Sequence, residues 1–497
     1  MNIKEAKNYI KDTITAYLKK DEFGDYRIPV EKQRPIFLIG APGIGKTAIM
    51  SQIANELDIA LVSYSMTHHT RQSALGLPYI KEKQYKDLTV SVSEYTMSEI
   101  IASVYDTMED SGVNEGILFL DEINCVSETL YPSMLQFLQY KVFGKHTVPE
   151  GWVIVTAGNP PEYNRAVREF DVVTLDRLKV ITVEADYPAW KSYAAKAGIH
   201  GAVTGFLESN KDCFYKVETT VYGKNYVTAR GWEDLSDMIK LYEEDGKSVS
   251  ENLISQYITD ERTVKEFSAY YDLYNKYRKQ YDVEAVFAGN LSEDTIKAAG
   301  AASVDERLAL TGLLADTLKS ETGDILMSHR MLAEIRTKIK DFADAKEDEA
   351  KTRLADLADS ARSVIARKSR AGSLSSDEKT RYKQIAKFYT DAKKRVNSGE
   401  KIKDIYNTRI NALRKEVSVE LERIDNLFAG MERIFGGDSN EMLMLVTEMT
   451  LSDNTGSFLS EFGSKSYEKY SSVLKVGDRA EKLRKEIMDL KELEELS

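Results

Sequence analysis

Short apolar runs alternate with amphipathic stretches over the first third of the chain. The runs are typical of buried strands and lie at residues 35–39, 60–65, 116–120, 152–157 and 179–183. Apolar residues at helical spacing predict helices between these strands, at 48–57 and about 127–140. The polar stretch 67–114, which contains Gly76, Leu77 and Pro78, is expected to be irregular. Strands joined by helices in this order predict an α/β fold, with a parallel sheet and helices on both faces.

From about residue 295 the strand pattern stops and helical stripes take over. One apolar stripe runs through 354–365 and another through 410–431. The linker 371–374 separates two helices, and Ser375 with Glu378 predicts a capping box for the second helix. Lys and Arg alternate with Asp and Glu on the outer faces, which favours a solvated surface over a nucleic-acid interface. This part of the chain is therefore predicted to form antiparallel helices or coiled-coil arms.

Length, charge and cysteine content narrow the class of protein. The 497 residues carry a net charge of −12, which disfavours broad, non-specific nucleic-acid binding. No apolar run approaches the ~18 residues of a membrane span. Apolar residues at positions 3, 6, 10 and 14 predict an amphipathic N-terminal helix and not a signal peptide. Two isolated cysteines, Cys125 and Cys213, are too few for a disulfide framework, so a reducing, cytoplasmic location is expected.

A glycine-rich loop follows the first predicted strand directly, and residues 40–47 match the pattern G-x-x-x-x-G-K-[ST]. Its glycines let backbone N–H groups point at phosphates, and the next helix adds the positive end of its dipole. Lys46 would reach the β- and γ-phosphates, and the Thr47 hydroxyl would bind Mg²⁺. The loop therefore predicts a nucleoside triphosphate site, and because it contacts phosphates and not the base it does not distinguish ATP from GTP. The expected binding residues are Gly40, Ala41, Pro42, Gly43, Ile44, Gly45, Lys46, Thr47 and Asp121.

Polar side chains follow two later strands. Asp121 and Glu122 come at the end of one apolar strand, and Asn159 follows the next. The carboxyl ends of parallel strands meet at one edge of a sheet, so we expect all three beside the phosphate loop. Asp121 would complete the Mg²⁺ site with Thr47, and Glu122 would orient and deprotonate the attacking water. Asn159 would hydrogen-bond that water or the γ-phosphate, and its alternative role is that of a turn residue.

Six motifs in this order resemble those of MoxR-type AAA+ ATPases, over roughly residues 25–290. They occupy residues 40–47, 118–124, 149–154, 157–160, 175–177 and 228–235. The resemblance implies a P-loop AAA+ domain at 1–187 with an insert around 71–114, and a helical lid at 188–290. The all-α segment 291–497 would be an extension outside the resemblance.

The same resemblance implies catalytic roles for two arginines, and for Asn159 as the sensor of the γ-phosphate. Arg177 would be an arginine finger that acts on the site of a neighbouring subunit, and Arg230 would be the sensor arginine of the lid. Such a finger can accelerate hydrolysis about 10³- to 10⁵-fold. Arg165 and Arg168 are the alternative fingers, and a surface pair with Asp176 is the alternative role of Arg177.

The sequence departs from the family pattern at two positions. Leu178 stands where the family usually has phenylalanine, and Ala229 where it usually has proline. Neither departure removes a charge, so both bear on fine geometry and not on activity.

The expected function is Mg²⁺-dependent ATP hydrolysis that drives chaperone-like remodelling or maturation of a partner protein. The resemblance implies a homo-oligomeric ring, expected to be a hexamer, and a von Willebrand factor A-type partner. The alternative is a nucleic-acid-dependent AAA+ motor or nuclease-associated translocase. That alternative needs a basic pore loop, for which the insert offers Lys81, Lys83 and Lys86 beside acidic residues. A scaffold with negligible turnover is disfavoured by Glu122 and Asn159.

Overall fold

The computed structural model describes residues 1–86, 88–163, 167–220, 223–280, 283–342 and 345–472. Contacts group the chain into two compact units, one made of 1–189 and 348–397 and the other of 190–347 and 398–497. The helical second half is therefore shared between the units, and the three-domain division stays a prediction. No helix in the described ranges combines the length and apolar character that crossing a membrane requires.

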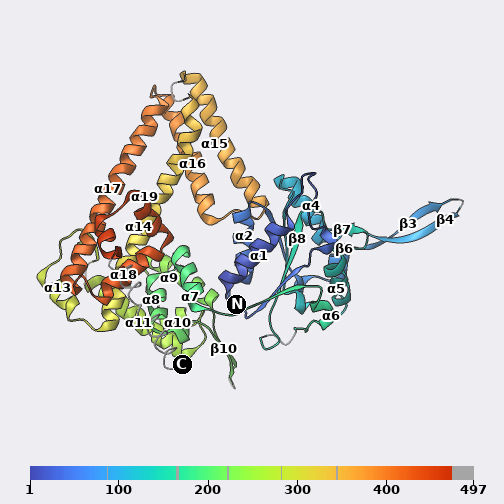
Figure 1. Cartoon of the computed structure of the whole chain (residues 1–497), viewed down its shortest axis with the longest axis horizontal. Coiled ribbons are helices and arrows are strands. Elements are labelled where there is room, and N and C mark those ends of the chain that lie inside the picture. Colours follow the sequence, from blue (N-terminus) through green and yellow to red (C-terminus); the bar gives the residue numbers. More distant parts are fainter. Residues whose placement is uncertain (87, 164–166, 221–222, 281–282, 343–344, 473–497) are drawn as a thin grey trace, which may run out of the picture. The chain divides into compact units, whose positions relative to one another are not determined.

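A five-stranded parallel sheet forms the centre of the first unit (Figure 1). Its order is β2-β5-β8-β1-β9, and every neighbouring pair is parallel. The strands are β1 Ile36–Gly40, β2 Ala60–Ser65, β5 Gly116–Asp121, β8 Trp152–Gly158 and β9 Lys179–Val183. All five predicted strands are confirmed. Strands β5 and β8 are buried along nearly their whole length, as expected for a sheet covered on both faces.

Helices cover both faces of this sheet, which confirms the predicted α/β class. Alternate residues of β5 point to opposite faces, so Leu118 and Leu120 pack with α4 and α5 in one core. Helices α1 and α2 contact strands β9, β2 and β5 and cover the other face. The bounds are α1 Ile3–Tyr17, α2 Lys46–Leu57, α4 Glu99–Ser111, α5 Tyr131–Tyr140 and α6 Val172–Leu175. The predicted N-terminal amphipathic helix is present as α1, with Ala6, Ile10 and Ile14 buried.

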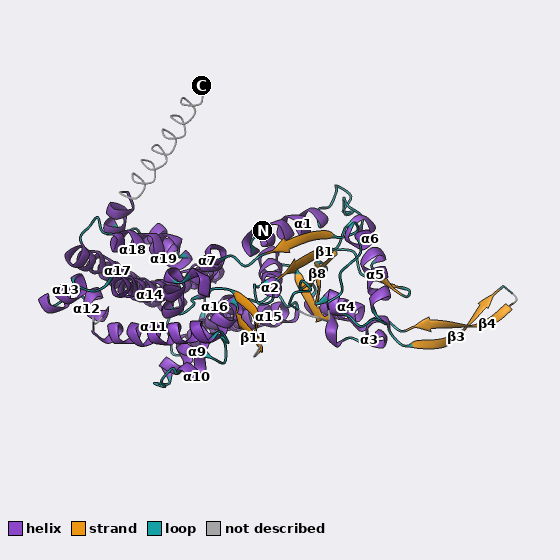
Figure 2. Cartoon of the chain, turned by 90° about the horizontal axis from the view of Figure 1, so that it is seen from below, coloured by secondary structure: helices purple, strands orange, loops and turns teal. Residues whose placement is uncertain are grey.

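The stretch 67–114 is not irregular, so that prediction was wrong. It contains helix α3 Arg71–Leu75, the antiparallel hairpin β3 Pro78–Tyr85 and β4 Leu88–Tyr95, and helix α4. Figure 2 shows the hairpin extending away from the sheet. Strand β3 is exposed at nearly every position, so it lacks the alternation of buried and polar residues by which strands are recognised. A second hairpin lies between α5 and β8, and its strands β6 Val142–Phe143 and β7 His146–Thr147 have two residues each.

The second unit is mainly helical, with the small antiparallel hairpin β10 Lys216–Thr220 and β11 Gly223–Val227. Its longest helices are α14 and α17, which pack against each other and against α18 and α19. The helices are α7 Tyr187–Ala197, at the boundary, α8 Gly201–Ser209, α9 Ala229–Glu244, α10 Glu251–Ile254, α11 Glu261–Gln280, α12 Val283–Phe287, α13 Glu293–Gly300, α14 Val304–Ile339, α17 Ile402–Phe435, α18 Asn440–Leu451 and α19 Asp453–Phe462.

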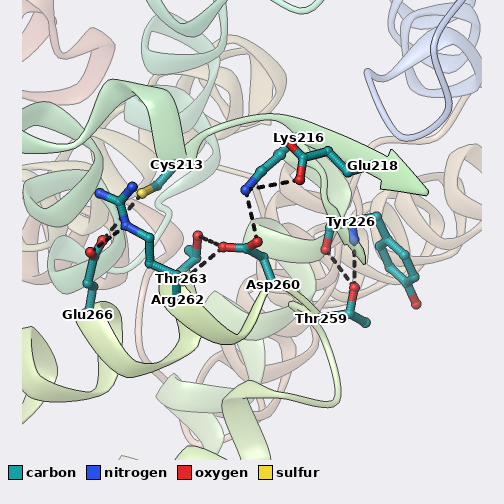
Figure 3. Close-up of polar contacts among 9 residues, drawn as sticks. All are labelled: Cys213, Lys216, Glu218, Tyr226, Thr259, Asp260, Arg262, Thr263 and Glu266. Atoms are coloured by element: carbon teal, nitrogen blue, oxygen red, sulfur yellow. Dashed lines mark hydrogen bonds and ion pairs between the residues drawn. The ribbon is translucent and has the colours of Figure 1, made fainter. Parts of the chain in front are cut away.

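A polar network joins the β10–β11 hairpin to the start of α11 (Figure 3). Asp260 accepts hydrogen bonds from the backbone N–H of Thr263 at 3.0 Å and from its hydroxyl at 2.7 Å. The same carboxylate pairs with the Lys216 ammonium at 3.1 Å. The Thr259 hydroxyl accepts a hydrogen bond from the Tyr226 backbone N–H at 2.6 Å. Asp260 therefore satisfies the first turn of α11 and fixes the base of the hairpin at once.

Helices α15 Glu347–Arg370 and α16 Ser376–Val396 form an antiparallel arm of the first unit (Figure 1). The predicted linker 371–374 is its tip, and Ser375 caps α16 by accepting from the Glu378 N–H at 3.2 Å. The predicted capping box is only half present. The Glu378 carboxylate instead accepts from the Asn55 amide and pairs with Lys368.

Asp316 of α14 places a carboxylate where it is poorly solvated. Its Oδ2 is shielded from solvent, and no donor within the described ranges reaches it. A Cβ added at Gly201 would lie 1.6 Å from this oxygen, so only glycine fits opposite the carboxylate. Desolvation by burial raises the pKa of Asp316 to about 6.

We expect Asp316→Asn to raise the free energy of unfolding at pH 7.5 by about 1–2 kcal/mol. The folded state binds the Asp316 proton more tightly, so wild-type stability falls as the pH rises from about 4 to about 6. The advantage of the variant should therefore shrink as the pH is lowered through this range. Urea unfolding followed by circular dichroism measures it, with the exposed Asp324→Asn on the same helix as the control. A variant no more stable than wild type at pH 7.5 would contradict the assignment.

Candidate active site

The phosphate loop runs from the end of β1 to the start of α2. Gly43 and Gly45 have φ angles of 73° and 95°, which L-amino acids with a side chain rarely adopt. A Cβ at Gly40 would lie 2.5 Å from the Val183 carbonyl oxygen of the neighbouring strand β9. The two other apolar positions, Ala41 and Ile44, are buried. The loop therefore needs its three glycines for backbone conformation and close packing.

Lys46 is the first residue of α2, and its side chain is only 7% exposed. Its ammonium donates to the carbonyl oxygens of Gly40 and Ala41, each at 2.8 Å. It also donates to Asn159 Oδ1 at 2.9 Å. Oxygen acceptors thus hold the charge at the loop and at the end of β8, where phosphate oxygens would be stronger acceptors of the same kind.

Thr47 and Asp121 meet directly. The Thr47 hydroxyl, in the first turn of α2, donates to Oδ2 of Asp121, at the end of β5, at 2.7 Å. A hydroxyl and a carboxylate are the hard oxygen donors that Mg²⁺ prefers, so the residues present fit this ion. The predicted pairing of these two residues is present in the structure.

Glu122 adopts a left-handed backbone conformation with φ of 56°, which is uncommon for a residue with a side chain. Its carboxylate accepts hydrogen bonds from the hydroxyls of Ser65 at 2.9 Å and Thr67 at 3.1 Å. Sequence reasoning missed both hydroxyls. The available signal was the pairing of neighbouring strands, because Ser65 at the end of β2 lies in register with Asp121.

Asn159 follows β8 and is held by a buried amide that the sequence did not single out. Asn124, 3% exposed, donates its Nδ2 to the Asn159 carbonyl oxygen at 2.9 Å. A Cβ at Gly158 would lie 2.4 Å from Asn124 Oδ1, so the glycine is needed for this contact. Asn159 is therefore more than a turn residue, because its side chain also accepts the hydrogen bond from Lys46.

Cys125 lies close to the two carboxylates. Burial raises the pKa of its thiol, and the charges of Glu122 and Asp121 raise it further. The thiol therefore stays protonated at neutral pH and is a poor nucleophile.

The arginines are placed differently from this cluster. Arg177 follows α6 and is exposed, and within the described ranges its side chain has no hydrogen bond or ion pair. Arg168 pairs with Glu128 and lies over the Tyr131 ring at 5.8 Å from its centroid. Arg165 lies outside the described residues. Arg230 is exposed in the first turn of α9, in the second unit.

Comparisons with known proteins agree with this geometry over part of the chain. Residues 36–175 match the family "AAA: ATPase family associated with various cellular activities". No curated protein matches the chain. The match covers β1, the phosphate loop, both carboxylates and Asn159, so this segment is an AAA-type P-loop ATPase domain.

Proposed function

We propose that this AAA-type domain hydrolyses ATP with Mg²⁺ in a homo-oligomeric ring and thereby remodels a partner protein in a chaperone-like way. One observation carries the hydrolysis. Polar side chains from the start of α2 and from two strand ends are hydrogen-bonded to one another, Lys46 to Asn159 and Thr47 to Asp121. Glu122 follows Asp121 directly, and its backbone N–H donates to Asp121 Oδ1 at 2.9 Å.

Each of these side chains has a distinct task in hydrolysis. Lys46 would bind the β- and γ-phosphates, and the backbone N–H groups of 43–47 would bind phosphate oxygens. Thr47 and Asp121 would hold Mg²⁺, which when bound offsets the negative charge of the phosphates. Glu122, kept in place by two hydroxyls, would accept the proton of the attacking water. Asn159 would hydrogen-bond the γ-phosphate.

Exposed side chains beside Arg177 support an oligomer. Val172 and Val173 of α6 are 81% and 59% exposed, although both are large apolar residues. Such residues favour coverage by another molecule. An exposed arginine next to them suits a residue that completes the site of a neighbouring subunit, whereas Arg168 already has partners within its own chain. We assign the finger to Arg177 and the lid sensor to Arg230.

Partner remodelling is preferred over a nucleic-acid motor because a carboxylate of the hairpin neutralises part of the basic charge there, although Lys81 and Lys86 are exposed. Lys83 of β3 pairs with Glu94 of β4, and Lys145 pairs with the same carboxylate. These pairs neutralise part of the charge that nucleic acid would need. The MoxR-type subfamily, the hexamer and a von Willebrand factor A-type partner belong to this proposal and rest on the sequence resemblance.

We expect Glu122→Gln to bind ATP normally and to hydrolyse it about 10²- to 10⁴-fold more slowly, because glutamine cannot accept the proton. Glutamine still accepts hydrogen bonds from Ser65 and Thr67, so the site should keep its shape. Steady-state phosphate release and binding of a fluorescent ATP analogue measure the two effects. A tagged Glu122→Gln protein held with ATP should also retain a partner that wild type releases.

The exposed Glu128→Gln variant is the matched control and should hydrolyse ATP at the wild-type rate within about twofold. Wild-type protein without Mg²⁺-dependent ATP hydrolysis in the presence of candidate partners would overturn the proposal. Equal turnover by wild type and Glu122→Gln would overturn the role of this carboxylate.

A further inference from the structure

The α15–α16 arm carries a charge opposite to that of the rest of the chain. Residues 360–396 contain eleven Lys and Arg but only three Asp and Glu, in a protein with a net charge of −12. The interleaving of charges expected for the helical half therefore fails over this segment. Such a local excess of cations attracts an anionic partner and increases its association rate.

The cations of the arm border a groove of about 460 Å³ between α15 and α16. Lys383 and Lys387 are exposed on its rim, and neither has a hydrogen bond or ion pair within the described ranges. Arg362 reaches across from α15 and donates to the Thr390 hydroxyl at 3.1 Å. Half-buried Ile365 and buried Ala386 also line the groove. The groove thus combines apolar side chains with a cationic rim.

The spacing of the cations suits a helical partner. Along α16, Lys387 lies four residues after Lys383, and Lys394 lies seven residues after Lys387. The three cations therefore follow one face of the helix, at intervals of about 6 Å and about 10 Å along its axis. Carboxylates four and seven residues apart on a second helix would repeat these intervals. Among the described residues, Asp391 is the one carboxylate that lines the groove, and it pairs with Lys394 at 3.3 Å. Two rim lysines therefore remain for an incoming acidic chain.

The lining favours an acidic peptide over nucleic acid. Within the part of the chain that the structure describes, no aromatic side chain lines the groove, whereas single-stranded nucleic acids are usually held by stacking on aromatic rings. A phosphate backbone would also make no use of Ile365 and Ala386. An amphipathic helix with a row of Glu or Asp beside its apolar face satisfies both features.

The tip of the arm is fixed to the helix that starts at the active-site lysine. The Leu61 N–H of β2 donates to the Ala371 carbonyl oxygen at 2.7 Å, and the Asn55 amide donates to the Ser373 carbonyl oxygen at 2.8 Å. Lys368 pairs with Asp58 at 3.0 Å. Asn55 and Asp58 lie at the end of α2, whose first residue is Lys46. An occupant of the groove is therefore linked to the phosphate loop through one helix.

We propose that the α15–α16 groove binds an acidic, amphipathic helical segment of a partner protein. The identification of that partner as the remodelled client rests on the proposed function. Binding itself requires only the groove.

A synthetic, fluorescein-labelled peptide of about three heptads tests the proposal, with Leu at a and d, Glu at b and e, and Ala and Gln elsewhere. Fluorescence anisotropy on the full chain should show saturable binding that weakens between about 50 and about 300 mM NaCl. The double variant Lys383→Glu/Lys387→Glu should lose about tenfold or more in affinity. The control Lys403→Glu/Lys415→Glu makes the same charge change on exposed positions of α17 and should lose less than about twofold.

Three outcomes would overturn the proposal: no binding of the peptide, equal losses in the two double variants, or equal binding of a scrambled peptide of the same composition. Tighter, groove-dependent binding of a DNA or RNA oligonucleotide would assign the groove to nucleic acid instead. ATP hydrolysis without peptide should be unchanged in both double variants. Because hydrolysis is measured separately, an inactive wild type that still binds the peptide would refute only the proposed function.

Discussion

Lys46→Ala is expected to lose ATP affinity by at least about 100-fold and to show no detectable hydrolysis. The variant removes a buried ammonium that three oxygen atoms already orient toward the loop. Charge-assisted contacts with phosphate are worth about twice a neutral hydrogen bond, and no neighbouring cation replaces them among the contacts described. Isothermal titration with ATP and a phosphate-release assay measure the two losses.

The control for this variant is Lys19→Ala, which removes an exposed lysine of the same unit. It should change neither affinity nor turnover. Circular dichroism and thermal unfolding without nucleotide establish whether Lys46→Ala is folded, because Lys46 also holds Gly40 and Asn159 together. A folded Lys46→Ala protein with wild-type ATP affinity would refute the assignment of the loop.

Arg177→Ala is expected to lower ATP turnover about 10³-fold or more while leaving ATP affinity nearly unchanged. The side chain is exposed and has no hydrogen bond or ion pair within the described ranges, and its charge only helps to lower the pKa of Asp171, so its loss should matter mainly at a neighbouring site. Mixing Arg177→Ala with Lys46→Ala should restore part of the turnover. In the mixed ring, an intact loop from one subunit meets an intact arginine from the next.

Arg168→Ala separates the finger from its main alternative. Arg168 pairs with Glu128 in its own chain, so its removal should cost far less turnover than the removal of Arg177. Mixed rings that stay inactive, although labelled subunits demonstrably exchange, would refute a trans role for Arg177. A greater loss in Arg168→Ala than in Arg177→Ala would move the finger to Arg168.

The sequence was sufficient to predict the sheet and the core of the site. Strands β5 and β8 are buried on both faces, so they appear as uninterrupted apolar runs ending in polar residues. The contact of Thr47 with Asp121 followed from the expectation that the carboxyl ends of parallel strands meet at one edge of the sheet. The hydroxyls that hold Glu122 did not, because β2 and β5 are adjacent in space while 50 residues separate their ends in sequence.

The exposed hairpin β3–β4 and the arm were predicted less well, for different physical reasons. Strand β3 is exposed at nearly every position, and β4 alternates only between exposed and half-buried residues, so neither strand has the buried apolar face by which strands are recognised. Both helices of the arm were anticipated, but their docking on α2 depends on polar contacts of Asn55, Asp58 and Lys368 over more than 300 residues of sequence. A chain truncated before the arm would lack these contacts altogether, so the truncation would uncover the edge strand β2 as well as remove the groove.

The arm tip covers β2, so this edge of the sheet can be covered only after the ribosome has synthesised Ala371. Strand β2 is at the edge of the sheet, and Ala371 accepts a hydrogen bond from it and is part of the same apolar core. An uncovered edge strand is a site for pairing with other chains. While the ribosome synthesises residues 190–347, the edge strand β2 of the nascent sheet therefore stays uncovered. A chaperone that shields β2 would be needed most during that interval, and stalled translation there should produce the most aggregation.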